Sequence, residues 1–197
     1  SSPVLESYYK ELNTDINTVG LWHMNEASGN LTDSSGNGLT GTVTGTTVVT
    51  GRLNNGRTFT SASSDKAIVT YNAILNLNTW TTEAWIKTTT TGVNQRIVYK
   101  GNGTTVDQYS MYISSSNNFL CEYYNAGPNY YTTVSAAKLQ DGNWHHVACV
   151  RSPNYGVFAY IDGILVATGT DGGNTVSDTN DLHIGDRAAA GYFNGTM

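Results

Sequence analysis

The stretch DSSGNGLTG, residues 33–41, places one carboxylate among small residues that form turns. Glycine adopts positive φ freely and asparagine tolerates it well, so this backbone can bend until several carbonyl oxygens point inward. A carboxylate oxygen together with inward carbonyls is the ligand set that Ca²⁺ prefers. The alternative is a surface turn in which Asp33 accepts hydrogen bonds from its own backbone. These residues therefore predict either a calcium site or a self-capped turn.

The remaining carboxylates do not have the spacing of a hydrolytic site. Glycoside hydrolases need two carboxyl groups on one face about 5–10 Å apart, which on a strand corresponds to acids at alternate positions. No such pair with strand spacing occurs, because Glu83 and Glu122 each stand alone on a predicted strand. Asp181 and Asp186 lie five positions apart, at the two ends of another predicted strand. We expect no enzymatic activity; convergence of distant carboxylates in the fold is the alternative.

Two further pairs of reactive side chains have structural interpretations. His145 and His146 are consecutive, and consecutive strand residues face opposite sides of a sheet, so both rings cannot readily bind one metal ion. We expect one ring to pack against the core and the other to face solvent or a neighbouring strand. Cys121 and Cys149 lie inside predicted strands, where we expect two buried free thiols. A disulfide is the alternative if the two strands are neighbours.

Tyrosines form the one surface feature that indicates recognition. The loop NAGPN, residues 125–129, is flanked by Tyr123, Tyr124, Tyr130 and Tyr131. Aromatic rings stack on sugar rings while their hydroxyls hold polar partners, so this cluster predicts a carbohydrate platform. Adjacent tyrosines alternate between faces, however, so at most half of them can serve one side of a sheet. Tyrosine is also a common strand residue, and a purely structural role is the alternative.

The composition limits the class of protein. Of 197 residues only 13% are charged, against roughly 25% in ordinary soluble domains, and Thr, Ser, Asn, Gly and Tyr are abundant instead. This favours a β-rich chain with many turns. The net charge is −5 with no cluster of Lys or Arg, which argues against nucleic-acid binding because phosphate affinity depends on basic contacts. No run of 18 apolar residues occurs, so we expect no membrane insertion.

Strands are predicted to carry these side chains. Residues 1–17 differ from the rest, with an apolar spacing that fits a short amphipathic helix or a tether. From residue 18 onward the periodicity is two, and TTEAWIKT places Thr82, Ala84 and Ile86 on one face and Glu83, Trp85 and Lys87 on the other. Around a dozen short strands, joined by turns such as Asp162-Gly163, predict one all-β domain over residues 18–197, built as a sandwich or barrel.

Seven stretches of the chain, taken in order, resemble the laminin G-like family in its bacterial and viral concanavalin A-like branch: GLWHMNEASGNLTDSSGNGLTG, GRLNNGRTFT, TTEAWIKT, GNWHHVACVRS, AYIDGILV, DLHIGD and YFNGTM. Together they cover residues 20–197. The resemblance implies an all-β, two-sheet antiparallel jelly-roll sandwich. It also implies a role in extracellular recognition or adhesion, often of carbohydrate, with no chemistry performed.

The resemblance further implies a calcium ion where the 33–41 loop meets the final strand. The matching positions are Asp33 as a side-chain ligand and the loop carbonyls near Asn37 as contributors. Family members usually continue after the YFNGTM position with an acidic ligand and a closing strand, whereas this sequence stops at Met197. We therefore expect a domain over residues 18–197 that lacks its last strand, and a site in which Ca²⁺ binds loosely or not at all.

Together these observations predict a non-catalytic recognition or adhesion module that binds carbohydrate or glycoprotein and is stabilised by calcium. We expect it outside the cell or on a cell or virion surface. The alternative is a structural subunit or decoration domain of an extracellular assembly such as a pilus, fibre, virion or surface layer. A homo-oligomer or filament partner would then complete the unclosed sheet edge. A glycoside hydrolase is the remote alternative.

Overall fold

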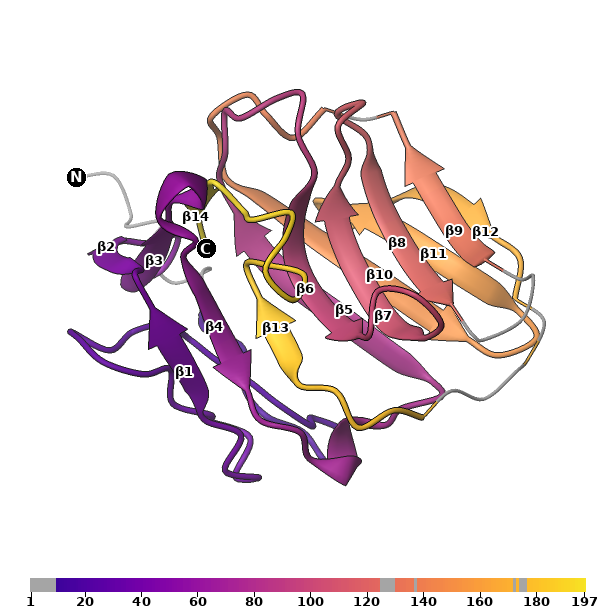
Figure 1. The fold of residues 1–197 in the computed structure, drawn as a ribbon, viewed down its shortest axis with the longest axis horizontal. Helices are drawn as coiled ribbons and strands as arrows, with labels where there is room; N and C mark the ends of the chain where they lie inside the picture. The colour runs from indigo at the N-terminus through magenta and orange to yellow at the C-terminus, as the bar shows by residue number, and fades with distance from the viewer. Residues whose placement is uncertain (1–9, 125–129, 137, 172, 174–176) are drawn as a thin grey trace, which may run out of the picture.

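The computed structural model describes the chain at residues 10–124, 130–136, 138–171, 173 and 177–197, without the side chains of residues 130–133. In these ranges antiparallel β-strands dominate, together with two short 3₁₀ turns, η2 (Ser61–Ser63) and η3 (Ala73–Leu75). The strands form two layers that pack against each other (Figure 1).

The first layer is a seven-stranded sheet in the order β1-β4-β13-β6-β7-β8-β9, which runs from left to right in Figure 1. Every neighbouring pair in it is antiparallel. Strand β13, from near the end of the chain, lies between β4 and β6. The strands are β1 (Gly41–Thr44), β4 (Lys66–Val69), β6 (Gln95–Gly101), β7 (Asp107–Ile113), β8 (Phe119–Tyr124), β9 (Tyr130–Ser135) and β13 (Leu182–Ile184).

The second layer combines a four-stranded sheet, β12-β11-β10-β5, with a three-stranded sheet, β14-β3-β2. Its strands are β2 (Thr47–Thr50), β3 (Asn55–Phe59), β5 (Trp80–Ile86), β10 (His145–Ser152), β11 (Gly156–Ile161), β12 (Ile164–Gly169) and β14 (Gly195–Thr196). Thr196 and Lys87, just after β5, exchange backbone hydrogen bonds of 2.8 and 2.9 Å. This bridge joins the two sheets into one layer.

Strand β14 is therefore wedged between β3 and the end of β5. It pairs with β3 on one side, and Met197 continues this pairing by exchanging backbone hydrogen bonds with Arg57. On its other side, Thr196 of β14 pairs with Lys87 of the second layer. The domain limits, and the expectation that a closing strand is missing, stay predictions.

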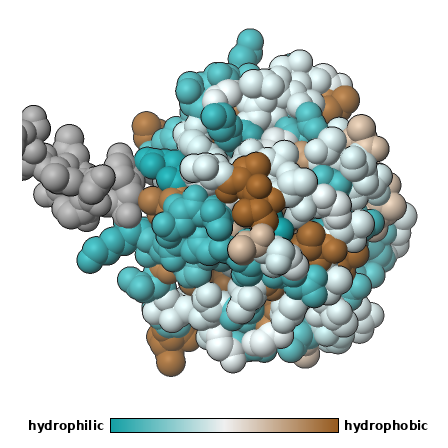
Figure 2. Space-filling view, turned by 90° about the vertical axis from the view of Figure 1, so that its left-hand side faces the viewer, coloured by the Kyte–Doolittle hydropathy of each residue, from teal (hydrophilic) through white to brown (hydrophobic). Residues whose placement is uncertain are grey.

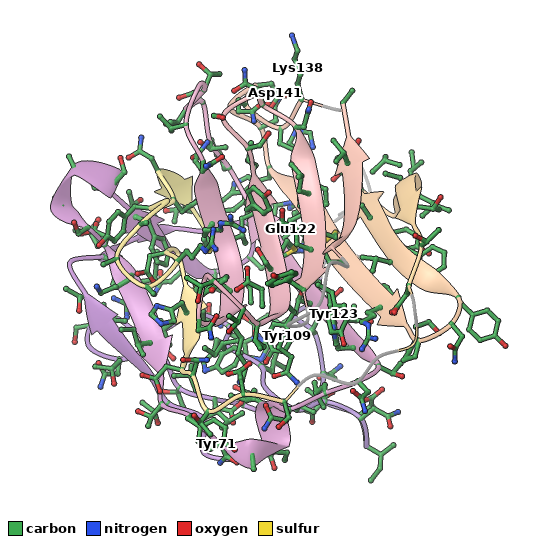
Figure 3. The ribbon with its side chains drawn as sticks, turned by 45° about the vertical axis from the view of Figure 1, so that its right-hand side comes forward. Tyr71, Tyr109, Glu122, Tyr123, Lys138 and Asp141 are labelled. Carbon is green, nitrogen blue, oxygen red and sulfur yellow. A yellow bond between two sulfur atoms is a disulfide. The ribbon has the colours of Figure 1, made fainter. Side chains whose placement is uncertain are left out.

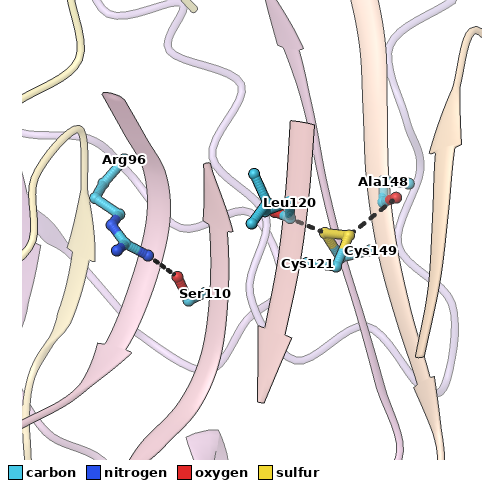
Figure 4. Close-up of a disulfide and its surroundings, with 6 residues drawn as sticks. All are labelled: Arg96, Ser110, Leu120, Cys121, Ala148 and Cys149. Atoms are coloured by element: carbon cyan, nitrogen blue, oxygen red, sulfur yellow. Dashed lines mark hydrogen bonds between the residues drawn. A yellow bond between two sulfur atoms is a disulfide. The ribbon is translucent and has the colours of Figure 1, made fainter. Parts of the chain in front are cut away.

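The core lies between the two layers and is closed by a disulfide. Buried apolar side chains such as Met111 and Phe119 of the seven-stranded sheet face others such as Val147 of the second layer. Cys121 of β8 and Cys149 of β10 are bonded to each other, with Cα atoms 5.5 Å apart and no exposed surface (Figure 4). The prediction of two free thiols is wrong, because β8 and β10 belong to different sheets and face each other across the core.

The architecture confirms the predicted antiparallel jelly-roll sandwich. Strand β5 alternates as expected, with Ile86 buried and Glu83 and Lys87 exposed. Asp162 and Gly163 connect β11 to β12, and their φ values of 50° and 77° are the positive values that a tight two-residue hairpin favours.

The amino-terminal prediction falls partly outside the described residues, which begin at residue 10. In residues 10–17 the structure shows no helix; Ile16 and Asn17 form a turn in which the Asp15 carboxylate accepts a hydrogen bond from the Asn17 amide. Helix formation is therefore not supported there.

None of the helices in the described part of the chain is long and apolar enough to cross a membrane. On the side of the molecule that carries β1 to β3, apolar residues are scattered among polar ones (Figure 2).

Candidate functional site

The loop that contains Asp33 is organised by hydrogen bonds to its carboxylate. Oδ1 accepts from the amides of Leu21 and Ser35, at 3.0 and 2.9 Å. Oδ2 accepts from the Ser35 hydroxyl at 2.7 Å and from the Leu39 amide at 3.0 Å. Burial acts to raise the pKa of Asp33, but these donors outweigh it and the pKa is lowered. The carboxylate thus ties two neighbouring segments to the loop.

This arrangement does not fit a calcium ion as it stands. Ca²⁺ takes about 6–8 oxygen ligands, and both oxygens of Asp33 are already occupied by protein donors. The Asn37 side chain donates from Nδ2 to the Val19 carbonyl at 2.9 Å, inside the same loop. Across the described ranges, no three or more His, Cys, Asp or Glu side chains are grouped so as to hold a metal. No observation tests calcium at Asp33 and Asn37 directly; the hydrogen bonds are those of the alternative prediction, the self-capped turn.

The predicted tyrosine platform is divided between the two faces of the seven-stranded sheet. Tyr123 points into the core with no exposed surface, and the guanidinium carbon of Arg151 lies 3.6 Å from its ring centroid. This corrects the expectation that Tyr123 belongs to a platform, because its ring cannot reach a ligand. Tyr124, the next residue along β8, belongs to the opposite, outer face and is partly exposed.

The other two tyrosines are placed through the backbone alone. Tyr130 pairs with Tyr124, and Tyr131 pairs with Tyr123. The side chains of Tyr130 and Tyr131, like the loop at 125–129, lie outside the described residues. A role of Tyr124, Tyr130 and Tyr131 in sugar binding stays a prediction.

The outer face that carries Tyr124 also carries a network of polar and charged side chains that sequence reasoning missed. The strand register places one row of four residues side by side across β13, β6, β7 and β8: His183, Tyr99, Ser110 and Glu122. Figure 3 shows Glu122 at the middle of this sheet. No sequence spacing connects these residues, because they come from four separate strands.

The first half of the network is centred on Glu122. Its Oε2 lies 3.3 Å from Nη1 of Arg96, and its Oε1 accepts a hydrogen bond of 2.5 Å from the Tyr112 hydroxyl. Nη1 of Arg96 also donates to the Ser110 hydroxyl (Figure 4), and the guanidinium lies 3.5 Å from the Tyr112 ring centroid. Burial and the Glu122 charge raise the pKa of Tyr112, so this hydroxyl remains a donor. The Arg96 side chain is 5% exposed and that of Glu122 is 16% exposed.

The second half is centred on Asp107. Its Oδ1 accepts hydrogen bonds from the Tyr99 hydroxyl at 2.7 Å and from the Gly103 amide at 3.1 Å. Nη2 of Arg187 lies 3.6 Å from its Oδ2 and donates to the Gly103 carbonyl at 2.6 Å. The side chain of Arg187 is 31% exposed and that of Asp107 only 6%. Here the cation is the more accessible partner.

The loop that follows β13 borders the network. His183 Nδ1 lies 2.7 Å from Oδ1 of Asp186, whose Oδ2 accepts from the Ala189 amide at 2.9 Å. The Arg96 amide donates to the Gly191 carbonyl at 2.7 Å, so this loop returns beside β6, as Figure 1 shows. The network therefore has its donors and acceptors held in place by backbone as well as by side-chain contacts.

This arrangement presents fixed hydrogen-bond donors and acceptors on a partly exposed face of the sheet. Charged side chains are costly to bury, and those on the outer face of the sheet do not contribute to the hydrophobic core between the layers. Fixed carboxylates can accept hydrogen bonds from ligand hydroxyls, and fixed guanidinium groups can donate to them. A partly exposed aromatic ring on the same face, that of Tyr124, can contact a sugar ring.

The two histidines have separate partners at the end of the second layer. His145 lies between two carboxylates, with Nδ1 at 2.8 Å from Asp162 and Nε2 at 3.1 Å from Asp141. His146 Nε2 is 3.2 Å from Glu83. The two rings thus contact different acids, as their alternation along the strand predicts, and they do not converge on one site.

Comparison with known proteins identifies a family. Residues 60–197 match the family model described as the concanavalin A-like lectin/glucanases superfamily. No match is found among curated proteins.

Solved structures share the fold at low sequence identity. Domain 4 of AbnA, an extracellular GH43 arabinanase from Geobacillus stearothermophilus in complex with arabinotriose, has a TM-score of 0.68 and 17% identity over 84% of this chain and 82% of that chain. The binding domain of botulinum neurotoxin DC in complex with SialylT has a TM-score of 0.64 and 16% identity, over 86% of this chain and 44% of that chain. The CBM40 of the Ruminococcus gnavus IT-sialidase bound to α2,6-sialyllactose has a TM-score of 0.51 and 22% identity, over 60% of this chain and 72% of that chain. The chain thus spans most of the arabinanase domain but less than half of the toxin binding domain.

Proposed function

The chain belongs to the concanavalin A-like lectin/glucanase superfamily, and we propose that it is a non-catalytic module that binds carbohydrate on the outer face of its seven-stranded sheet. The proposal rests on the network of Arg96, Asp107, Glu122 and Arg187. These charged groups are fixed on the outer face of the sheet, which points away from the hydrophobic core. The ligand class is supported by the arabinotriose and sialyllactose bound to two domains of the same fold.

Each exposed part of the network has a role in this proposal. Glu122 accepts hydrogen bonds from sugar hydroxyls, and Arg187 donates to hydroxyl or ring oxygens. Tyr124 stacks against the apolar face of a sugar ring. Arg96, Tyr112 and the other buried members hold these groups in position.

Binding rather than hydrolysis is proposed because of how the carboxylates are held. A glycosidase requires one carboxyl group that delivers a proton and another that attacks or activates water. In this network Glu122 is bonded to Tyr112 and faces Arg96, while Asp107 is bonded to Tyr99 and Gly103. Such partners fix a carboxylate as a hydrogen-bond acceptor.

An extracellular or surface location is part of the proposal. Disulfides persist in oxidising compartments and are rare in reducing ones. The Cys121–Cys149 bond is fully buried between the two sheets, where it supports the packing of one on the other. We propose no role for calcium in ligand binding, because the Asp33 oxygens are occupied by protein donors.

A glycan array tests the proposal. The folded protein is expected to bind a subset of oligosaccharides, and Tyr124→Ala is expected to weaken that binding about tenfold or more, as loss of a central aromatic contact does. Tyr155→Ala is the matched control, because Tyr155 is 82% exposed in the turn between β10 and β11, away from the seven-stranded sheet. The proposal fails if the folded protein binds no glycan, or if the two variants behave alike.

A second candidate is a structural component of an extracellular assembly. Strand β12 is an edge strand of the four-stranded sheet and exposes Ile164 (67%) and Leu165 (47%). Exposed apolar edge strands are prone to pair with another chain. Light scattering coupled to size-exclusion chromatography distinguishes the candidates. Oligomers that dissociate in Leu165→Lys favour assembly, whereas a concentration-independent monomer removes this candidate.

A further inference from the structure

We infer, on the basis of the proposed carbohydrate site, that the network selects uncharged sugars over acidic ones and that Glu122 determines this specificity. Two properties of the network set this preference: which of its charges are compensated, and which charged group of the Arg96–Glu122 pair a ligand meets first.

Both arginines of the network are already paired. Arg96 lies 3.3 Å from Glu122, and Arg187 lies 3.6 Å from Asp107. A third carboxylate, Asp186, is 2.7 Å from the His183 ring. With the bordering Asp186 included, three carboxylates lie beside two arginines, so neither arginine lacks a carboxylate partner.

An acidic sugar is favoured by a cation whose charge is not yet compensated, and each arginine of the network has a carboxylate beside it. A carboxylate that loses its water on binding is stabilised chiefly by a guanidinium or ammonium group that can bond to it directly. Nη1 of Arg96 is directed at Ser110 and Glu122. Lys66, on β4 of the same sheet, is not part of the network, and its ammonium group lies over the Tyr192 ring, 5.8 Å from the centroid.

Exposure decides which partner of the Arg96–Glu122 pair a ligand meets first. The Glu122 side chain is 16% exposed and that of Arg96 only 5%, so the carboxylate is the accessible group. An incoming carboxylate would be repelled there, because like charges brought together at an interface disfavour binding. A sugar hydroxyl can donate to the same oxygen without this cost.

The other pair does not change this conclusion. Arg187 is more exposed than Asp107, but the Asp107 carboxylate 3.6 Å away compensates its charge, and its Nη2 donates to the Gly103 carbonyl at 2.6 Å. It remains a donor suited to a neutral oxygen of the ligand. The network therefore offers one accessible acceptor and one accessible donor, which is the pairing that sugar hydroxyls satisfy.

Paired glycans test the inference with the unmodified protein. The probes are printed oligosaccharides, each present with and without a terminal uronic or sialic acid, at fixed ionic strength. We expect the uncapped member of each bound pair to bind about tenfold or more tightly than its acidic counterpart. Equal or tighter binding of the acidic members would overturn the inference and leave the proposed function standing. Failure of every probe to bind would instead overturn the proposed function.

Glu122→Gln tests the role assigned to Glu122. The substitution keeps the shape, removes the negative charge and leaves Arg96 uncompensated, so the preference for uncapped glycans should shrink several-fold or reverse. Glu83→Gln makes the same change in charge beside His146 on the other layer and should leave the preference unaltered. A folded Glu122→Gln protein with unchanged preference would overturn the inference, as would an equal change in both variants. Because the comparison of paired glycans with the unmodified protein needs no variant, the inference stays testable even if Glu122→Gln does not fold.

Discussion

Loss of the Cys121–Cys149 disulfide should destabilise the protein by a predictable amount. The two cysteines are 28 residues apart in sequence and join β8 of one sheet to β10 of the other. In the chain-entropy description, a crosslink that closes a loop of this length lowers the entropy of the unfolded chain by about 12 cal/mol/K, or about 3.6 kcal/mol at 25 °C. Alanine at both positions also removes two buried sulfur atoms, which adds a packing loss on the order of 1 kcal/mol.

The assay is equilibrium unfolding in guanidinium chloride of the wild type and of the double variant Cys121→Ala/Cys149→Ala. Tryptophan fluorescence reports the transition, because Trp80 is only 3% exposed in the core. We expect the free energy of unfolding to fall by about 4–5 kcal/mol. Mass spectrometry after alkylation without reductant is the control, and it should find no free thiol in the denatured wild type.

A loss smaller than about 1 kcal/mol would refute the reasoning, because it would mean that the bond does not restrict the unfolded chain as its loop length requires. Alkylation of both cysteines in the denatured, unreduced wild type would refute the bond itself. Either result would also remove the support that the disulfide gives to an extracellular location.

Two further features lead to predictions about metal and pH. Asp33→Asn should lower the free energy of unfolding by about 1–3 kcal/mol, because Asn presents an amide to the donors that the carboxylate now satisfies. Chelation with EDTA should leave the wild-type melting temperature unchanged; a fall that added Ca²⁺ restores would contradict the self-capped loop. Burial opposes protonation of His145, but the Asp162 and Asp141 carboxylates outweigh it and raise its pKa above 6.5. The protonated His145 ring therefore contributes fully to the free energy of unfolding below pH 6.5, and this contribution is lost as the pH rises through the raised pKa of the folded protein. Between pH 6.5 and about 9, the melting temperature of the wild type should fall more than that of His145→Gln; parallel curves would contradict the ion pairs.

Local features were predictable from sequence because they depend on neighbouring residues. The alternation of β5 follows from the two-residue period of any strand, and the Asp162-Gly163 turn follows from the positive φ that its residues tolerate. The disulfide was not predictable, because nothing local says that β8 and β10 face each other across the core.

The candidate site could not be predicted from sequence, because its residues are far apart in the chain and the pairing of their strands is irregular. The register of β6 shifts between Arg96 and Val98, so Arg96 joins the outer network while Val98 packs against the core. A strict period of two would place both on one face, and a β-bulge is what breaks this rule. A second shift, between Asp107 and Ser110, occurs where β7 meets β8. Sequence periodicity could therefore indicate the sheet but not the set of side chains that it turns outward.

Amide chemical-shift mapping tests the central claim most directly. A neutral oligosaccharide that binds on the array is added to ¹⁵N-labelled protein, and the shifts of the backbone amides are followed to saturation. We expect the largest changes on the middle strands of the seven-stranded sheet, β6 to β8, around Arg96, Tyr112 and Glu122. Changes confined to other regions, such as the 33–41 loop or the second layer, with β6 to β8 unaffected, would contradict it.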